Sequence, residues 1–319
     1  MRRKEISTKP TVMNKERTIS LSKNLHIPLV GFGTYLISND DAAQAVSNAI
    51  ESGYRHVDTA EAYRNEQGVG MGIQSGLGKT GLSRDQLFIT TKLWPGNAQW
   101  GDTPKTFDTT ITSLNASLGR LQLEYVDLYL IHATFDPGQR LEQWKGLVEL
   151  KRQGKARAIG VSNFSEQHIE ELRSAGLPLP AANQIELHPW SQKPQLIRYL
   201  RKNGIVPIAY SSLVPLSTWR AAKGQDSAKT EQMQKDSQDA DSPFKKMAQK
   251  YGVSEAQVLL RWGVQNGYPV LPKSMNSARL KENIDLFSFS IDEEDMATIE
   301  KMDRGDGVAW AFGDPTRNA

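Results

Sequence analysis

Short apolar segments alternate with longer amphipathic segments along most of this chain. The apolar segments are IPLVGFG, YRHVD, LFITTK, YVDLYLIH, ARAIGVSN, AANQIE, IVPIAY and YPVLPKS, and each is followed by a stretch with helical spacing of its apolar residues. Strands that are apolar throughout and are joined by helices form parallel sheets with both faces covered. Eight such units in about 270 residues predict a closed (β/α)8 barrel, a TIM barrel, rather than a doubly wound sheet.

The beginning of the chain differs from this repeating pattern. Residues 1–16 are basic and polar, and we expect them to form a disordered arm. Residues 17–27 alternate around a polar Ser-Lys-Asn centre, which predicts a small β-hairpin ahead of the barrel. The domain prediction is therefore a single barrel domain over residues 17–319.

Two tracts interrupt the alternation near the end of the chain. Residues 214–243 are too long and polar for an ordinary connection, which leaves a lid, an insertion or a disordered loop. Trp219 favours the lid, because it is an apolar side chain within an otherwise solvated run. The tail 303–319 places Trp310 and Phe312 among glycines, and we expect it to be a loop that packs over a substrate pocket.

The charge pattern and the residue usage exclude several classes of protein. The 39 basic and 36 acidic residues nearly balance, so no polybasic field for nucleic acid is present. No window is apolar enough for a membrane span. The absence of cysteine removes disulfides and thiolate chemistry. We expect a cytoplasmic protein and, since no heptad repeat is present, a monomer.

Polar residues stand where the predicted strands end. In a (β/α)8 barrel the chemistry is located at the carboxyl ends of the strands. The residues at these positions are Asp58, Lys92, His132, Ser162, Asn163, Gln184, Tyr210, Lys273 and Ser274. Tyr63 follows Asp58 by five residues, at the start of a helical pattern. These side chains are therefore the candidates for a site at the mouth of the barrel.

A carboxylate, a phenol and an ammonium group in one site suit proton transfer. The unperturbed pKa of tyrosine is near 10, which is too high for efficient proton donation at neutral pH. A Lys92 ammonium about 4 Å from Tyr63 would contribute roughly 4 kcal/mol at an effective dielectric of ~20 and lower the pKa of the phenol. Asp58 would pair with Lys92, and His132 would either hydrogen-bond a substrate oxygen or relay a proton. Hydrogen-bond donors placed around one substrate oxygen predict reduction of a carbonyl group.

Several separated motifs resemble those of aldo-keto reductases. They are GFGTY at 31–35, DTAEAYRNE at 58–66, TKLW at 91–94, DLYLIH at 127–132, GVSNF at 160–164, NQIELHP at 183–189, and LPKS with RLKEN within 271–283. The resemblance extends from about residue 17 to residue 312. It implies reversible NADPH-dependent reduction of aldehydes or ketones, with Tyr63 as general acid, Lys92 and Asp58 tuning it, and His132 orienting the carbonyl.

The same resemblance implies a set of cofactor contacts. Ser162, Asn163 and Gln184 would hold the nicotinamide carboxamide, and Tyr210 would stack on the ring. The remaining implied contacts are Thr34, then Ser211 and Leu213 in a loop over the pyrophosphate, then Lys273, Ser274 and Arg279 at a 2'-phosphate, and Glu282 and Asn283 at the adenine. A compact cationic site with a hydroxyl favours NADPH over NADH. Met275 and Asn276 fill variable positions, so use of NADH as a weaker alternative stays open.

The resemblance also implies a substrate pocket made by Tyr35, Trp94, Ala133 and Trp310. Tyr35 stands where many members have tryptophan. Ala133 follows His132 at a position where a larger side chain can stand, which predicts room for bulky carbonyl substrates.

Other patterns have simpler interpretations. Gly68, Gly70 and Gly72 do not directly follow a strand, so we do not interpret them as a dinucleotide fingerprint. No histidine pair has metal-ligand spacing, and we predict no metal site. Two alternative functions remain open at this point: a catalytically weak NADPH-binding regulatory or sensing protein on the same fold, and, with less support, a metal-dependent barrel hydrolase.

Overall fold

The computed structural model describes residues 17–217, 229–239, 241–305, 307, 309–310 and 314–317. The predicted arm 1–16, Trp219 and Phe312 lie outside the described residues. Within these ranges, no helix has the length and apolar character needed to cross a membrane.

Seven parallel strands form a curved sheet in sequence order, preceded by an antiparallel pair. The pair is β1 (Thr18–Ser22) and β2 (Leu25–Pro28), and the sheet consists of β3 (Phe32–Gly33), β4 (His56–Asp58), β5 (Phe88–Leu93), β6 (Val126–Ile131), β7 (Ala156–Ser162), β8 (Ala182–Glu186) and β9 (Val206–Tyr210). The eighth predicted strand is reduced to Val270, which bridges both Val30 and Ala209. Because Val270 pairs with the chain at both ends of the sheet, it closes the barrel.

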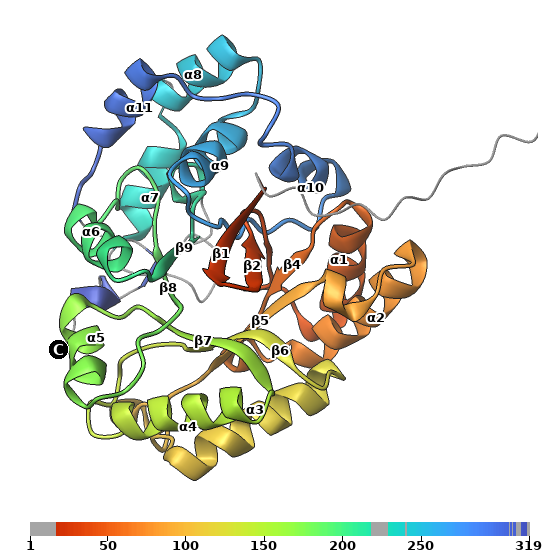
Figure 1. Ribbon diagram of the computed structural model, residues 1–319. Helices are drawn as coiled ribbons and strands as arrows, with labels where there is room; N and C mark the ends of the chain where they lie inside the picture. Colours follow the sequence, from red (N-terminus) through yellow and green to blue (C-terminus); the bar gives the residue numbers. More distant parts are fainter. Residues whose placement is uncertain are drawn as a thin grey trace, which may run out of the picture.

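The helices cover the outside of this ring of strands (Figure 1). They are α1 (Asn39–Glu51), α2 (Glu66–Thr80), α3 (Phe107–Leu121), α4 (Arg140–Arg152), α5 (Glu166–Ser174), α6 (Pro194–Lys202), α7 (Thr230–Ser237), α8 (Pro243–Tyr251), α9 (Glu255–Gln265), α10 (Ser277–Ile284) and α11 (Glu293–Glu300). Ser38, Thr106 and Ser165 cap the starts of α1, α3 and α5 through their side-chain oxygens. The predicted (β/α)8 barrel with an N-terminal hairpin is confirmed.

The hairpin closes one end of the barrel. Figure 1 shows β1 and β2 at the centre of the ring of strands. Leu25 and Ile27 pack in one apolar cluster with residues at or near the starts of the parallel strands, including Phe88 and Val206. This end of the barrel is therefore filled with apolar side chains. An open site can form only at the other end, where the carboxyl ends of the strands lie.

The long polar tract is partly folded. Its described parts contain a short 3-10 helix (Val214–Leu216) and α7. Met233 of α7 is buried and clusters with Val214 and Trp190. Residues 230–237 therefore form a helix that packs on the barrel, and the lid interpretation stays a prediction.

The glycines of α2 are explained by close helix packing. A Cβ atom on Gly68 would lie 2.0 Å from the Asn39 carbonyl oxygen, and one on Gly72 would lie 2.6 Å from the Ala43 carbonyl oxygen. Both contacts are to the backbone of α1, which therefore approaches α2 directly. Close helix packing therefore explains these glycines without a nucleotide-binding motif.

Substitution of Gly68 by alanine is expected to lower the free energy of unfolding by about 1–3 kcal/mol, the usual cost of overpacking a tight contact. Gly78 is a matched control on the same helix, because a Cβ atom there would meet nothing within 4 Å. Gly78→Ala is expected to raise the free energy of unfolding by about 0.5–1 kcal/mol, because alanine has the higher helix propensity. Urea titration of both variants measures the difference, and equal effects would contradict the packing argument.

Candidate active site

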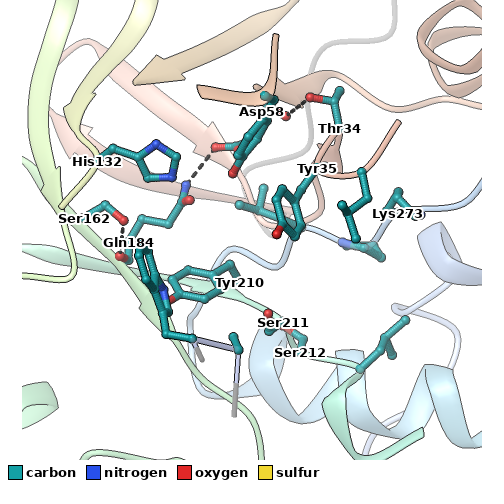
Figure 2. Close-up of a pocket in the computed structure, with 18 of the residues that line it drawn as sticks. Thr34, Tyr35, Asp58, His132, Ser162, Gln184, Tyr210, Ser211, Ser212 and Lys273 are labelled. Atoms are coloured by element: carbon teal, nitrogen blue, oxygen red, sulfur yellow. Dashed lines mark hydrogen bonds between the residues drawn. The ribbon is translucent and has the colours of Figure 1, made fainter. Parts of the chain in front are cut away.

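A cavity of about 480 Å³ lies at the carboxyl ends of the strands. The residues predicted for the site that line it are Thr34, Tyr35, Asp58, Tyr63, Trp94, His132, Ser162, Asn163, Gln184, Tyr210, Ser211, Leu213, Lys273 and Trp310. Figure 2 shows His132, Ser162 and Gln184 on one side of this space and Ser211, Ser212 and Lys273 on another. The fold therefore brings together residues from nearly the whole length of the chain.

A buried ion pair stands at the base of the cavity. Asp58 ends β4, and Lys92 projects from the neighbouring strand β5. The Lys92 ammonium donates to Asp58 Oδ1 at 2.5 Å and to the Thr59 carbonyl oxygen at 2.9 Å. The side chains of Lys92 and Asp58 are only 0% and 4% exposed. Burial lowers the pKa of Lys92, and the Asp58 carboxylate opposes that shift. Lys92 itself stands behind the cavity wall.

Tyr63 is held by the turn that follows β4. It ends a 3-10 helix (Glu61–Tyr63), and Arg64 then adopts a left-handed backbone conformation with φ of 55°. The buried Asn65 side chain donates to the carbonyl oxygens of Thr34 and Ile37. These bonds fix the turn against the neighbouring loop, so the contacts of Asn65 are structural. The Tyr63 hydroxyl lies 3.4 Å from the Lys92 ammonium.

The pKa of Tyr63 differs from the prediction made from sequence. Burial raises the pKa of Tyr63 well above its usual value, and electrostatic interactions with Asp58 and Tyr35 raise it further. The predicted direction of the net shift is therefore wrong. Burial, which leaves a phenolate poorly solvated, and the nearby Asp58 carboxylate together outweigh the effect of the Lys92 ammonium on this pKa. Tyr63 is consequently a protonated phenol at neutral pH.

His132 faces Tyr63 across the site. Its ring packs edge-on against the rings of Tyr63 and Trp94, with centroid distances of 5.6 Å and 5.9 Å. Burial and the nearby Lys92 charge hold the pKa of His132 well below its usual value. The imidazole is therefore neutral at physiological pH and carries one N–H group, which suits it to donate a hydrogen bond to a ligand oxygen.

Four polar side chains from β7, β8 and β9 form a connected wall. Gln184 Nε2 donates to Asp58 Oδ2 at 2.7 Å, and the Ser162 hydroxyl donates to the backbone carbonyl oxygen of Gln184 at 2.8 Å (Figure 2). The Tyr210 hydroxyl donates to Asn163 Oδ1 at 2.7 Å. Asn163 has a positive φ of 65°, a strained conformation of the kind that gathers at functional sites. These hydrogen bonds therefore fix the orientation of the four side chains in the wall.

The residues predicted for the phosphate end are less tightly gathered. Lys273 lines the cavity, but Ser274, Arg279, Glu282 and Asn283 do not. The Ser274 hydroxyl accepts the backbone N–H of Asn276 at 3.1 Å, in the turn before α10. Lys273 and Arg279 are exposed and have no ion-pair partner among the described residues. Two cations thus remain available to an anionic ligand at this end.

Trp94 and Trp310 line the cavity, and the rings of Phe135 and Trp100 pack against them. The ring of Trp94 lies 5.5 Å from that of Phe135, which in turn lies 5.6 Å from that of Trp310. Trp100 stacks on Trp94 at 6.2 Å. The sequence-based prediction did not include Phe135 and Trp100, although both are aromatic residues in loops that directly follow strands, which could have identified them.

Ala133 does not lie on the cavity wall. Its side chain is buried, and it is absent from the described residues that line the cavity. The structure therefore does not place it in the substrate pocket. The reason is that successive side chains of an extended segment point to opposite sides, so the residue after His132 points away from the space that His132 faces.

The fold and this cluster define a class of protein: a (β/α)8 barrel in which a buried lysine and aspartate pair supports a tyrosine and a histidine at the carboxyl ends of the strands. The described residues contain no group of three side chains that could hold a metal ion. The chain belongs to the aldo/keto reductase family, whose model matches residues 29–304.

Comparison with individual proteins agrees with this assignment. The chain is 37% identical to morphine 6-dehydrogenase of Pseudomonas putida, over 91% of this chain and 93% of that protein. It is 36% identical to the NAD(P)H-dependent D-xylose reductase I,II of Candida tropicalis, over 97% of each. Among solved structures, the Bombyx mori aldo-keto reductase in complex with NADP superposes with a TM-score of 0.78 at 34% identity, covering 90% of this chain and 93% of that one.

Proposed function

We propose that the protein is an NADPH-dependent reductase of aldehydes or ketones that also works in the direction of alcohol oxidation. The observation that carries this proposal is the Tyr63 hydroxyl, which lies 3.4 Å from the buried Lys92 ammonium and faces a cavity shared with His132. The names of the similar proteins, a morphine 6-dehydrogenase and an NAD(P)H-dependent D-xylose reductase, support the same type of reaction in both directions.

The cluster can activate a carbonyl group by donating to its oxygen. When bound, NADPH supplies the hydride that adds to the carbonyl carbon. Tyr63 is protonated because its pKa is raised, and it donates its proton to the carbonyl oxygen. The neutral His132 donates a hydrogen bond to the same oxygen and so fixes its position. The product is the alcohol, and Tyr63 is left as a phenolate.

Lys92 and Asp58 act at the moment when Tyr63 loses its proton. The phenolate is stabilised by the ammonium 3.4 Å away, since opposite charges in a buried site attract strongly. Asp58 keeps Lys92 charged and fixed in place through the 2.5 Å bond. In the oxidation direction the same phenolate takes the proton from the alcohol.

The residues around the cavity fit a dinucleotide. Ser162, Asn163 and Gln184 would hold the carboxamide of the nicotinamide, because their amide and hydroxyl groups complement an amide. Tyr210 would support the ring with its aromatic face. At the other end Lys273 and Arg279 would bind the 2'-phosphate, and Ser211 and Leu213 would lie against the pyrophosphate.

A comparison of NADPH with NADH tests both the function and the phosphate site. We expect NADPH to be consumed with an aromatic aldehyde, and Arg279→Ala to reduce kcat/KM for NADPH by about 10–100-fold, the worth of a charge-assisted contact. The value for NADH should stay within about twofold. Lys281→Ala is the matched control, because it removes an exposed cation from the same helix, and we expect no change in selectivity.

Two results would contradict these proposals. Tight NADPH binding without turnover across a broad panel of carbonyl compounds would favour the sensing protein considered from the sequence. Equal losses for NADPH and NADH in Arg279→Ala would contradict the placement of the 2'-phosphate while leaving the reductase assignment intact.

A further inference from the structure

Glu186 is a buried carboxylate without a part in the proposed reaction. It ends β8 two residues after Gln184, and it is 1% exposed. The His188 ring nitrogen Nε2 lies 2.9 Å from Glu186 Oε1. Since a carboxylate only accepts hydrogen bonds, the imidazole is the donor. A carboxylate is costly to bury, which makes its other contacts informative.

Glu186 binds the backbone of the C-terminal segment. Both of its carboxylate oxygens lie 3.1 Å from the backbone N–H of Ala309. The neighbouring Gly307 is packed so closely that a Cβ atom there would lie 2.4 Å from Glu186 Oε2. The tail therefore passes directly over the carboxylate, more than a hundred residues away along the chain.

The residue after this contact forms part of the cavity wall. Trp310 lines the cavity, its indole N–H donates to the Tyr210 hydroxyl at 2.8 Å, and its ring lies 5.6 Å from that of Phe135. A single peptide unit separates the anchored N–H of Ala309 from Trp310. The position of the indole therefore depends on the bond between Glu186 and Ala309.

Other contacts fasten the same segment at its two ends. The Asp303 carboxylate accepts the backbone N–H of Gln192 at 3.1 Å, and the Lys193 ammonium pairs with Asp314. These contacts lie several residues from Trp310 on either side. Glu186 is the anchor next to Trp310. The contacts of Asp303 and Asp314 lie farther along the segment, on either side of it.

We propose that Glu186 is a positioning residue that fixes Trp310 against Phe135 and thereby determines selectivity for carbonyl compounds with a planar aromatic body. The proposal rests on the proposed carbonyl reductase function. An aromatic substrate contacts Trp310, which lines the cavity and packs against Phe135, whereas a small aliphatic aldehyde reaches only Tyr63 and His132. Glu186 acts through the tail and does not touch the substrate.

The kinetic test compares 2-naphthaldehyde with propanal in Glu186→Gln, which keeps the size of the side chain but removes its charge. We expect KM for 2-naphthaldehyde to rise about tenfold while kcat and the values for propanal stay within about twofold. Asp303→Asn is the matched control, since it makes the same carboxylate-to-amide change at an anchor far from Trp310. It should leave both substrates within about twofold of the wild type.

A second variant approaches the same contact from the tail. Gly307→Ala would press a methyl group against Glu186 without altering the barrel, and it should reproduce the change in KM. In a Trp310→Ala background, Glu186→Gln should cause no further change, because its effect passes through Trp310. Equal effects of Glu186→Gln on the two substrates, or a further tenfold loss in the Trp310→Ala background, would overturn the proposal.

Hydrogen exchange separates this proposal from the proposed function. Backbone amides of Gly307, Ala309 and Trp310 should exchange faster in Glu186→Gln than in the wild type, with the rest of the protein unchanged. Unchanged exchange in this segment would overturn the positioning role even if the enzyme is active. A wild-type protein that turned over no carbonyl compound would overturn the reductase assignment, and exchange would still report whether Glu186 holds the tail.

Discussion

Replacement of Tyr63 by phenylalanine is expected to lower kcat for carbonyl reduction by roughly 10²–10⁴-fold, the usual contribution of a positioned general acid. The variant loses the hydroxyl to which the Lys92 ammonium donates at 3.4 Å. The dissociation constant of NADPH should change by less than about twofold, because the ring remains in place. Single-turnover kinetics and a fluorescence titration of NADPH measure the two quantities separately.

Tyr35→Phe is the control for this experiment. Tyr35 also lines the cavity, its ring lies 5.1 Å from that of Tyr63, and it is 47% exposed. Removal of its hydroxyl should change kcat by less than about threefold. Undiminished turnover in Tyr63→Phe would rule out Tyr63 as the acid.

The pH dependence gives a further check on the same residue. An acid is active in its protonated form, which is present below its pKa and is lost as the pH rises through it. Because the pKa of Tyr63 is raised, the reduction rate should not fall through loss of this proton between about pH 6 and about pH 9. A fall within that range that disappears in Tyr63→Phe would contradict a raised pKa.

Lys92→Met is expected to lower the free energy of unfolding by about 3–5 kcal/mol, because it leaves the Asp58 carboxylate buried without its partner. Asp58 retains the bond from Gln184 at 2.7 Å, but a neutral amide compensates a buried charge less well than an ammonium does. Turnover should also be lost, since no cation then stabilises the phenolate of Tyr63. Urea unfolding and a turnover assay measure the two effects.

The double variant Asp58→Asn with Lys92→Met separates stability from activity. Removal of both charges abolishes the uncompensated carboxylate, so stability should return to within about 2 kcal/mol of the wild type. Activity should not return, because the ammonium is still missing. A double variant as unstable as Lys92→Met would contradict the view that the buried charge causes the instability, and restored turnover would contradict the role of Lys92.

Much of the site could be predicted because strand ends are visible in the sequence. Asp58, Lys92 and His132 each stand where an apolar run stops, and parallel strands in a barrel bring such positions to one face. The prediction for Ala133 failed because it ignored the alternation of side chains along an extended segment. Phe135 lies in a loop, whose path the local pattern does not determine.

The sequence by itself determined the order of the parallel strands and the helices between them, since the period of apolar residues depends only on local geometry. It also determined which polar residues stand at the mouth of the barrel. Only the tertiary structure decided in which direction the pKa of Tyr63 is shifted, because the shift depends on the burial of the phenol and on the nearby Asp58 carboxylate. It alone brought Glu186 to Ala309, because contacts between distant segments depend on how the whole chain packs.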